Sequence, residues 1–202
     1  MKRPLEDDAS AEPLVVQLLC TNDTHSQMEP FAATKGSEQG RMVGGVAQRA
    51  AVFDAMRAEC PEATLTLDAG DTLVGTPFFE FLGGEADLIV MRELGYDAVA
   101  VGNHDFDGSD PAAGDGPEAR GLGFFKALAA RHSPGLRVLC ANVREEATGA
   151  RVFAPHATFE RGGVKVGVAA VLGQEAWEVV GTASHAASVR LGWCATCDDW
   201  LQ

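Results

Sequence analysis

Three short apolar segments of the chain each end abruptly in a polar cluster that carries acidic or histidine side chains. They are LVVQLLC (14–20) followed by TNDTHS, ATLTLDAGD (63–71), and DAVAV (97–101) followed by GNHDFD. An apolar run of this length that stops at a polar turn is typical of a strand buried in a sheet. The pattern therefore predicts three strands, each with polar side chains at its carboxyl end.

The segments between these strands predict helices. Residues 44–60 place apolar side chains near helical spacing and leave Arg49 and Arg57 free to face water. Residues 123–132 predict another helix. Between them, a segment that begins at residue 76 also has helical character, and its start and interruption are marked by four residues. These are Thr76 as N-cap, Pro77 at the first helical position, and Gly83 and Gly84 as the expected break.

The remainder of the chain predicts more sheet. Residues 136–143 predict a fourth strand, and residues 153–173 predict a hairpin that turns at Gly162 and Gly163. Strands that alternate with helices are typical of the α/β class with a largely parallel sheet. With 202 residues and 46% apolar composition, the chain is long enough for one domain with a sizeable core.

Six polar residues directly follow the first three predicted strands: Asp23, His25, Asp71, Asn103, His104 and Asp105. Ligands gather at the carboxyl ends of the strands in sheets of this class, so we expect these side chains to lie close together. Carboxylates and imidazoles on one face suit divalent metal ions, and two such ions about 3.5 to 4 Å apart can activate a shared water for attack on a phosphoryl group. Each cluster alone is more typical of a turn or helix cap than of a site, but three in succession favour a site.

The segments NDTHS, GG, GDTLVGTP and GNHDFD, in this order and spacing, resemble the N-terminal metallophosphoesterase domain of the 5′-nucleotidase family, within the calcineurin-like superfamily. GNHDFD alone indicates the superfamily, whereas TNDTHS and GDTLVGTP indicate the nucleotidase branch. The resemblance covers about residues 14–172. It implies an α/β fold with a layered metallophosphoesterase-like sheet and flanking helices, of which the second half is incomplete.

The resemblance also implies roles for the six residues. Asp23 and His25 would bind the first metal ion, Asp71 would bridge both ions, and Asn103 would bind the second. His104 would hydrogen-bond a phosphoryl oxygen or assist the leaving group, and Asp105 would orient its imidazole. The implied cofactors are two divalent metal ions, such as Zn²⁺ or Mn²⁺, and the implied substrate is a nucleotide or another small phosphate ester.

The chain departs from the family pattern after the hairpin. Family members complete the metal shells with later histidines, typically in a Gly-His-x-His motif, which this sequence lacks. His185 is the one histidine in the tail, and His132 and His156 are expected to be structural. The C-terminal domain that stacks the nucleotide base in the family also has no counterpart. We therefore expect a disordered leader over 1–13, a partial metallophosphoesterase domain over 14–180 and an unassigned tail over 181–202.

Three functions remain open at this stage. The first is metal-dependent hydrolysis of phosphate monoesters, with nucleotides as substrates, in an enzyme whose activity is reduced by truncation. The second is hydrolysis of cyclic nucleotides, UDP-sugars or other phosphodiesters by the same residues. The third is a non-catalytic remnant that binds metal ions. A purely structural protein would leave the order of the three polar clusters unexplained.

Composition and charge exclude several partners. The formal net charge of −13 argues against a nucleic-acid polymer, because binding to its phosphates depends on clustered Lys and Arg. No signal peptide and no apolar run of about 18 residues are visible, so no membrane span is expected and the cytoplasm is the default location.

The five cysteines lack the spacing of a disulfide framework, and Cys20 and Cys140 are expected to be buried thiols. No feature sets an oligomeric state.

Overall fold

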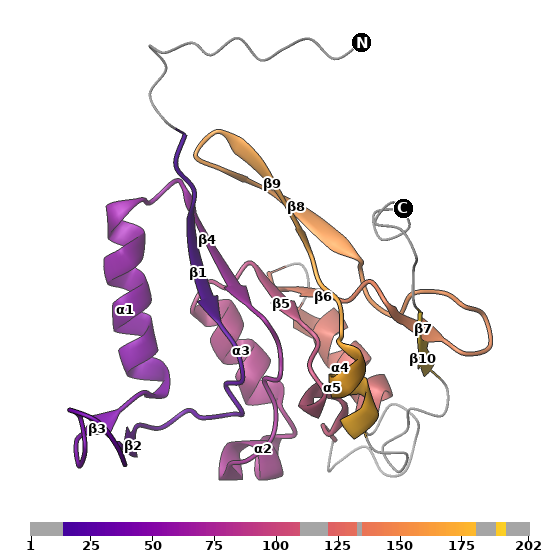
Figure 1. The fold of residues 1–202 in the computed structure, drawn as a ribbon, viewed down its shortest axis with the longest axis horizontal. Helices are drawn as coiled ribbons and strands as arrows, with labels where there is room; N and C mark the ends of the chain where they lie inside the picture. Colours follow the sequence, from indigo (N-terminus) through magenta and orange to yellow (C-terminus); the bar gives the residue numbers. More distant parts are fainter. Residues whose placement is uncertain (1–13, 110–120, 133–134, 181–188, 193–202) are drawn as a thin grey trace.

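The computed structural model describes residues 14–109, 121–132, 135–180 and 189–192 (Figure 1). Its centre is a four-stranded sheet in the order β1-β4-β5-β6, in which every neighbouring pair is parallel. The strands are β1 (Gln17–Thr21), β4 (Thr64–Asp68), β5 (Ala98–Ala100) and β6 (Arg137–Leu139). The α/β class predicted from the sequence is thereby confirmed, and the ends of β1, β4 and β5 point to the same edge of the sheet.

Helices connect the parallel strands, as such connections require. They are α1 (Gly45–Glu59), α2 (Pro77–Leu82), α3 (Glu85–Glu93), the 3₁₀ turn η1 (His104–Phe106) and α4 (Gly121–His132). The break between α2 and α3 falls at Gly83 and Gly84, as predicted, and both glycines have left-handed backbone conformations. The larger hydrophobic core contains side chains of the sheet and of these helices, including Leu19, Phe53, Leu88, Met91, Val99, Phe125 and Leu128.

A hairpin of β8 (His156–Arg161) and β9 (Val164–Ala169), orange in Figure 1, packs against the sheet through a second, smaller cluster. Ala98 and Leu139 contribute to this cluster from the sheet, and Ala157 contributes from β8. Since Ala98 lies in the smaller cluster and the adjacent Val99 in the larger core, β5 is buried on both faces. The hairpin turns at Gly162 and Gly163, as the sequence predicted.

The predicted strand over 136–143 is wrong in one respect, because it is two strands. β6 belongs to the main sheet, whereas β7 (Val143–Glu145) pairs with β10 (Val189–Leu191) in an antiparallel ribbon. Asn142 lies between them, where its buried side chain exchanges two hydrogen bonds with the main chain of Leu172. The short ribbon β2 (Phe31–Ala32) and β3 (Met42–Val43) and the helix α5 (Gln174–Val179) complete the described elements and were not predicted.

Two side-chain predictions for α1 are wrong. Arg49 lies over the ring of Tyr96, 5.9 Å from its centroid, and Arg57 lies over the ring of Phe53 at 5.2 Å. Arg57 also donates hydrogen bonds to Thr66 and to the carbonyl of Gly95. Both arginines therefore use their long stems to bring the guanidinium against neighbouring side chains rather than into water.

The predictions for individual cysteines and histidines have mixed outcomes. Cys140 is buried, but Cys20 is exposed, because it lies on the face of β1 opposite to the buried Leu19. His132 is buried at the end of α4, consistent with a structural role. His185 lies outside the described residues, as do Cys194 and Cys197. Among the helices that the structure describes, none is long and apolar enough to cross a bilayer.

Candidate metal centre

The loops after β1 and β4 run side by side beyond the end of the sheet. Backbone amides of the first loop donate to carbonyls of the second: Asp23 to Gly70 at 3.0 Å, His25 to Asp71 at 3.4 Å, and Ser26 to Thr72 at 2.8 Å. These bonds continue the parallel register that ends with Thr21 opposite Asp68. The sheet therefore brings the residues of NDTHS and GDT together directly.

The same two loops carry unusual backbone strain. Non-glycine residues with positive φ in the described chain are Asp23 (51°), His25 (44°), Ser26 (51°), Asp71 (62°) and Val74 (89°). All of them lie in the loops after β1 and β4. Such conformations cost of order 1 to 3 kcal/mol each and persist only where the surroundings over-determine them, most often at functional sites. The strain thus marks these loops independently of their residue types.

The third loop approaches the second so closely that only glycine fits at the contact. A Cβ atom on Gly102 would lie 2.3 Å from the backbone nitrogen of Asp71, and one on Gly70 would lie 2.8 Å from the backbone nitrogen of Gly102. The glycines of GD and GNHD therefore allow two main chains to touch. Their contact sets the distance between Asp71 and the residues that follow Gly102.

Replacement of Gly102 by alanine is expected to lower the free energy of unfolding by about 3 kcal/mol, because the added methyl group meets main-chain atoms that have no room to move. Urea denaturation followed by circular dichroism measures this. Gly167→Ala in β9 is the matched control, since a Cβ atom there meets nothing within 4 Å. Equal stability of the two variants would contradict the close approach.

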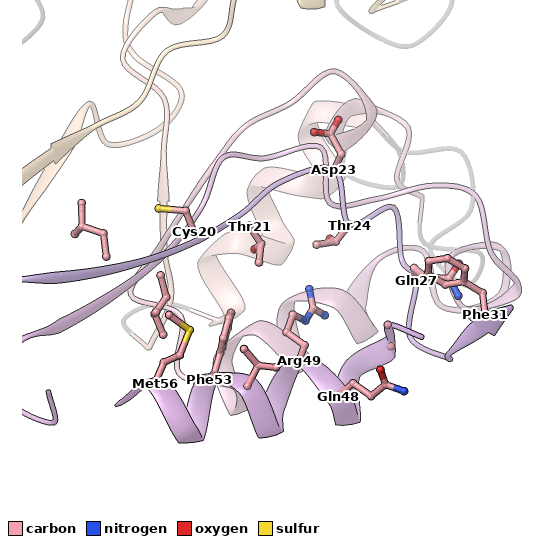
Figure 2. Close-up of a pocket in the computed structure, with 15 residues that line it drawn as sticks. Cys20, Thr21, Asp23, Thr24, Gln27, Phe31, Gln48, Arg49, Phe53 and Met56 are labelled. Carbon is pink, nitrogen blue, oxygen red and sulfur yellow. The ribbon is translucent and has the colours of Figure 1, made fainter. Parts of the chain in front are cut away.

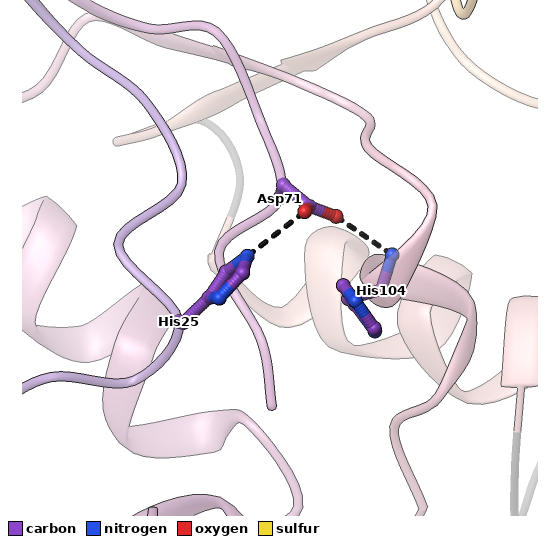
Figure 3. Close-up of side chains that lie close together, drawn as sticks. All are labelled: His25, Asp71 and His104. Atoms are coloured by element: carbon purple, nitrogen blue, oxygen red, sulfur yellow. Dashed lines mark hydrogen bonds and ion pairs between the residues drawn. The ribbon is translucent and has the colours of Figure 1, made fainter. Parts of the chain in front are cut away.

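His25, Asp71 and His104 form the centre of the cluster (Figure 3). One carboxylate oxygen of Asp71 lies 2.9 Å from Nε2 of His25, and the other accepts a hydrogen bond of 2.7 Å from the backbone amide of His104. The two imidazole rings meet edge to face with centroids 5.2 Å apart. One potential ligand atom from each of the three residues lies within 4.8 Å of the others.

The remaining predicted ligands lie at the margin of this cluster. A carboxylate oxygen of Asp23 is 3.9 Å from Nε2 of His25, and its side chain is 58% exposed. The side-chain amide of Asn22 donates to the same carboxylate. Asn103 is half-buried at the start of η1, where its carbonyl accepts a hydrogen bond from the amide of Phe106. The structure therefore brings His25, Asp71 and His104 together, with Asp23 beside them.

Asp105 occupies a different place from the one expected. Its carboxylate is fully buried and accepts hydrogen bonds from the backbone amides of Gly102, Asp71 and Thr72 and from the hydroxyl of Thr72. Burial raises its pKa to about 6, against the effect of these hydrogen bonds. None of these contacts is to the ring of His104, so Asp105 joins the second and third loops rather than orienting the imidazole.

Asp107 is the residue that contacts the imidazole, and sequence reasoning missed it. Its carboxylate lies 2.7 Å from Nδ1 of His104. A position three residues after a histidine in a helical turn is the signal that could have identified it, since such pairs lie on one face. With Nδ1 engaged, the tautomer of His104 that donates to Asp107 leaves Nε2 as the free ring nitrogen.

A groove of about 860 Å³ runs between β1 and α1 and reaches the candidate metal centre (Figure 2). Asp23 and Thr24 line it near the centre, while Arg49 and Phe53 line it from α1. β1 is an edge strand of the main sheet, so its outer side borders this groove. The exposed carboxylate of Asp23 points away from α1 in Figure 2 and is open to a cation.

No family model matches the chain, but relatives and solved structures do. A probable 5′-nucleotidase of Treponema pallidum is 32% identical over 166 residues, which are 80% of this chain and 26% of that protein. The crystal structure of a 5′-nucleotidase precursor from Thermus thermophilus superposes with a TM-score of 0.70 at 34% identity, over 88% of this chain and 32% of that one.

A calcineurin-like phosphoesterase of Bacillus subtilis shares the fold, with a TM-score of 0.63 at 22% identity over 87% of this chain and 53% of that one. The chain thus spans about a quarter to a third of the two nucleotidases that it matches at more than 30% identity. By sequence and by fold, the chain is a relative of the 5′-nucleotidases, and it shares the fold of a calcineurin-like phosphoesterase.

Proposed function

We propose that residues 14–180 form a metallophosphoesterase domain that hydrolyses phosphate monoesters, with nucleotides as the substrate class. The observation that carries this proposal is the cluster of His25, Asp71 and His104, whose potential ligand atoms lie within 4.8 Å of one another. The cluster lies where three strand ends meet, in a chain whose relatives are named 5′-nucleotidases. Both the donor types and their position support the same chemistry.

The donor set fits divalent metal ions. Asp71 offers two carboxylate oxygens in the middle of the cluster and is the natural bridge between two ions. His25 and Asp23 would hold one ion, and the amide oxygen of Asn103 would contribute to the second. Divalent ions bound there would lower the pKa of a water molecule and neutralise charge on the phosphoryl oxygens. Imidazole and carboxylate ligands suit Zn²⁺ and Mn²⁺.

The short contact between His25 and Asp71 has a consequence for metal binding. Nε2 of His25 and a carboxylate oxygen of Asp71 lie at hydrogen-bond distance, 2.9 Å apart. A metal ligand must offer a free lone pair, so a hydrogen on Nε2 would have to move to Nδ1 or to solvent when His25 binds a cation. Metal binding would thus replace this hydrogen bond.

His104 is the residue we assign to the substrate. Asp107 holds Nδ1, which orients the ring. When the ring also carries a proton on Nε2, that N–H can donate to a phosphoryl oxygen or deliver the proton to the leaving oxygen of the ester. Asp107 acts through His104 and is a positioning residue, whereas Asp105 fixes the loop that carries both.

The assay that tests the proposal is phosphate release from AMP by the purified chain, with and without added Mn²⁺ or Zn²⁺. We expect release that depends on the metal and is inhibited by a chelator. Faster hydrolysis of bis(p-nitrophenyl) phosphate than of AMP would favour the phosphodiester alternative. Tight metal binding in calorimetry without release of phosphate from either compound would favour the non-catalytic alternative.

Replacement of His104 by alanine is expected to lower kcat by about 100-fold or more, because general acid catalysis contributes factors of this size. The affinity for Mn²⁺, measured by calorimetry, is expected to change by less than about threefold, since the other donors remain. Asp107→Asn is the milder companion variant, because it keeps an oxygen near Nδ1. A parallel loss of metal affinity in His104→Ala would make the imidazole a metal ligand instead.

A further inference from the structure

Ser26 is the most firmly held residue of the loop after β1. It is buried, with 1% of its surface exposed, and its backbone has a φ of 51°. Three hydrogen bonds fix it: its amide donates to the carbonyl of Thr72 at 2.8 Å, its carbonyl accepts from the hydroxyl of Thr76 at 2.9 Å, and its hydroxyl donates to Asp87 at 3.0 Å. These bonds reach two segments of the chain, the loop after β4 and the helix α3.

Asp87 is an unexpected residue at its position in α3. Its side chain is buried, as are the side chains of Leu88 and Met91 on the same helix. Burial raises its pKa to about 7, so the carboxylate is held there at a cost. A buried carboxyl group is a poor way to stabilise a fold, because apolar residues of similar volume often serve equally well or better. Its one side-chain hydrogen-bond partner in the described chain is Ser26.

His25 directly precedes Ser26 and shares its left-handed backbone, with a φ of 44°. Left-handed conformations of non-glycine residues relax toward extended or right-handed ones unless neighbouring contacts prevent it. The amide of His25 donates only a long bond of 3.4 Å to the carbonyl of Asp71, so this backbone contact holds the histidine weakly. A turn bond of 2.9 Å from the amide of Gln27 to the carbonyl of Thr24 closes over His25 and Ser26, and the three bonds of Ser26 fix this turn to the rest of the chain.

We propose that Asp87 and Ser26 are positioning residues for the candidate metal centre. Asp87 holds the hydroxyl of Ser26, and Ser26 in turn keeps His25 in the backbone conformation that directs Nε2 at Asp71. This inference rests on the proposed function, because it assigns the pair a role in metal binding. It also explains why a carboxyl group lies buried in α3, outside the segments that resemble the family motifs.

Co²⁺ titration of the full chain by calorimetry and by its visible absorption tests the inference with four variants. Ser26→Ala and Asp87→Leu remove the bond, whereas Asp87→Asn keeps an oxygen that can accept it. Replacing a residue that holds a metal ligand in place typically lowers metal affinity by about 10- to 100-fold. We expect a loss of this size in Ser26→Ala and Asp87→Leu, and recovery of the wild-type affinity in Asp87→Asn. Arg161→Gln is the control: Arg161 binds the carbonyl of Thr64 and the side chain of Asp97 at the opposite ends of the strands.

The free energy of unfolding separates positioning from a structural role. Asp87→Leu is expected to unfold no more easily than the wild type, because it removes a buried carboxyl group from an apolar face. Arg161→Gln is expected to lose stability while its Co²⁺ affinity stays within about twofold of the wild type, because its contacts lie away from the metal ligands. Wild-type affinity in Ser26→Ala and Asp87→Leu would overturn the inference.

Amide hydrogen exchange without metal gives a second, independent readout. The Ser26 amide is expected to exchange at least about tenfold faster in Asp87→Leu, as local opening becomes easier, while the amide of Leu67 in β4 keeps its rate. If the wild type bound no Co²⁺, the proposed function would fail. The exchange rates would then still decide whether Asp87 restrains the loop, and unchanged rates would refute that restraint.

Discussion

Asp71→Asn is expected to abolish tight metal binding and to lower phosphate release by about a thousandfold or more, because in the proposed centre Asp71 would be the bridging ligand and the variant lacks its charge. The substitution is conservative in shape: asparagine keeps one oxygen for the backbone amide of His104, which lies 2.7 Å from the carboxylate in the wild type. It cannot offer two anionic oxygens in the middle of the cluster. Calorimetric titration with Mn²⁺ and the AMP assay measure the two losses separately.

Asp54→Asn makes the same change in net charge on the exposed surface of α1 and is the control for long-range electrostatics. Its metal affinity is expected to match the wild type, since charges in solvent are screened beyond about 10 Å. Because Asp71 also binds Nε2 of His25, some loss of stability is expected in Asp71→Asn. A wild-type rate of phosphate release in this variant would remove Asp71 from the proposed mechanism.

The sheet and its connections could be predicted because each strand is encoded locally. An apolar run buried on both faces, such as residues 97–101, needs no knowledge of distant contacts to be read as a strand. The same holds for the break at Gly83 and Gly84 and for the hairpin turn at Gly162 and Gly163, where glycine accepts left-handed conformations. The edge of the sheet at which the polar residues gather follows from parallel pairing alone.

The features that were missed depend on contacts between residues far apart in the sequence. Residues 136–143 look like one strand, but Asn142 binds Leu172, 30 residues away, and ends the pairing with the main sheet. Cys20 is exposed because its face of β1 is not covered, and the sequence of one strand does not show which of its faces will be covered. Arg49 was expected to face water because helical spacing alone does not show that Tyr96, in the connection between α3 and β5, lies beside it.

In the candidate metal centre, too, some features could be predicted from the sequence and others could not. The sequence predicted which loops meet, but not which carboxylate of GNHDFD serves the imidazole. Asp105 and Asp107 both follow His104, and only the 3₁₀ turn places Asp107 beside the ring and turns Asp105 into the interior. The burial of Asp87 could not be predicted either, because nothing in the neighbouring sequence distinguishes a buried acidic residue from an exposed one.

Asp105→Ala is expected to be strongly destabilising, with a loss of about 3 to 5 kcal/mol in the free energy of unfolding, because four hydrogen bonds to one buried carboxylate would be lost at once. Each oxygen of Asp105 accepts two hydrogen bonds, one pair from Thr72 and the other from the amides of Gly102 and Asp71. Asparagine does not rescue this arrangement, since its amide group would face two donors. Asp105→Asn should therefore also lose stability, by about 2 kcal/mol.

Asp107→Ala provides the matched control, because it removes a carboxylate two residues away that is 38% exposed and contacts one imidazole. Its unfolding free energy is expected to change by less than about 0.5 kcal/mol, as for most surface positions. In chemical denaturation, the loss of unfolding free energy is expected to be largest for Asp105→Ala, smaller for Asp105→Asn and smallest for Asp107→Ala. The reverse order would mean that the second and third loops are joined by Asp107 and His104 rather than by Asp105, and that the glycine contact between Gly70 and Gly102 holds without a buried carboxylate.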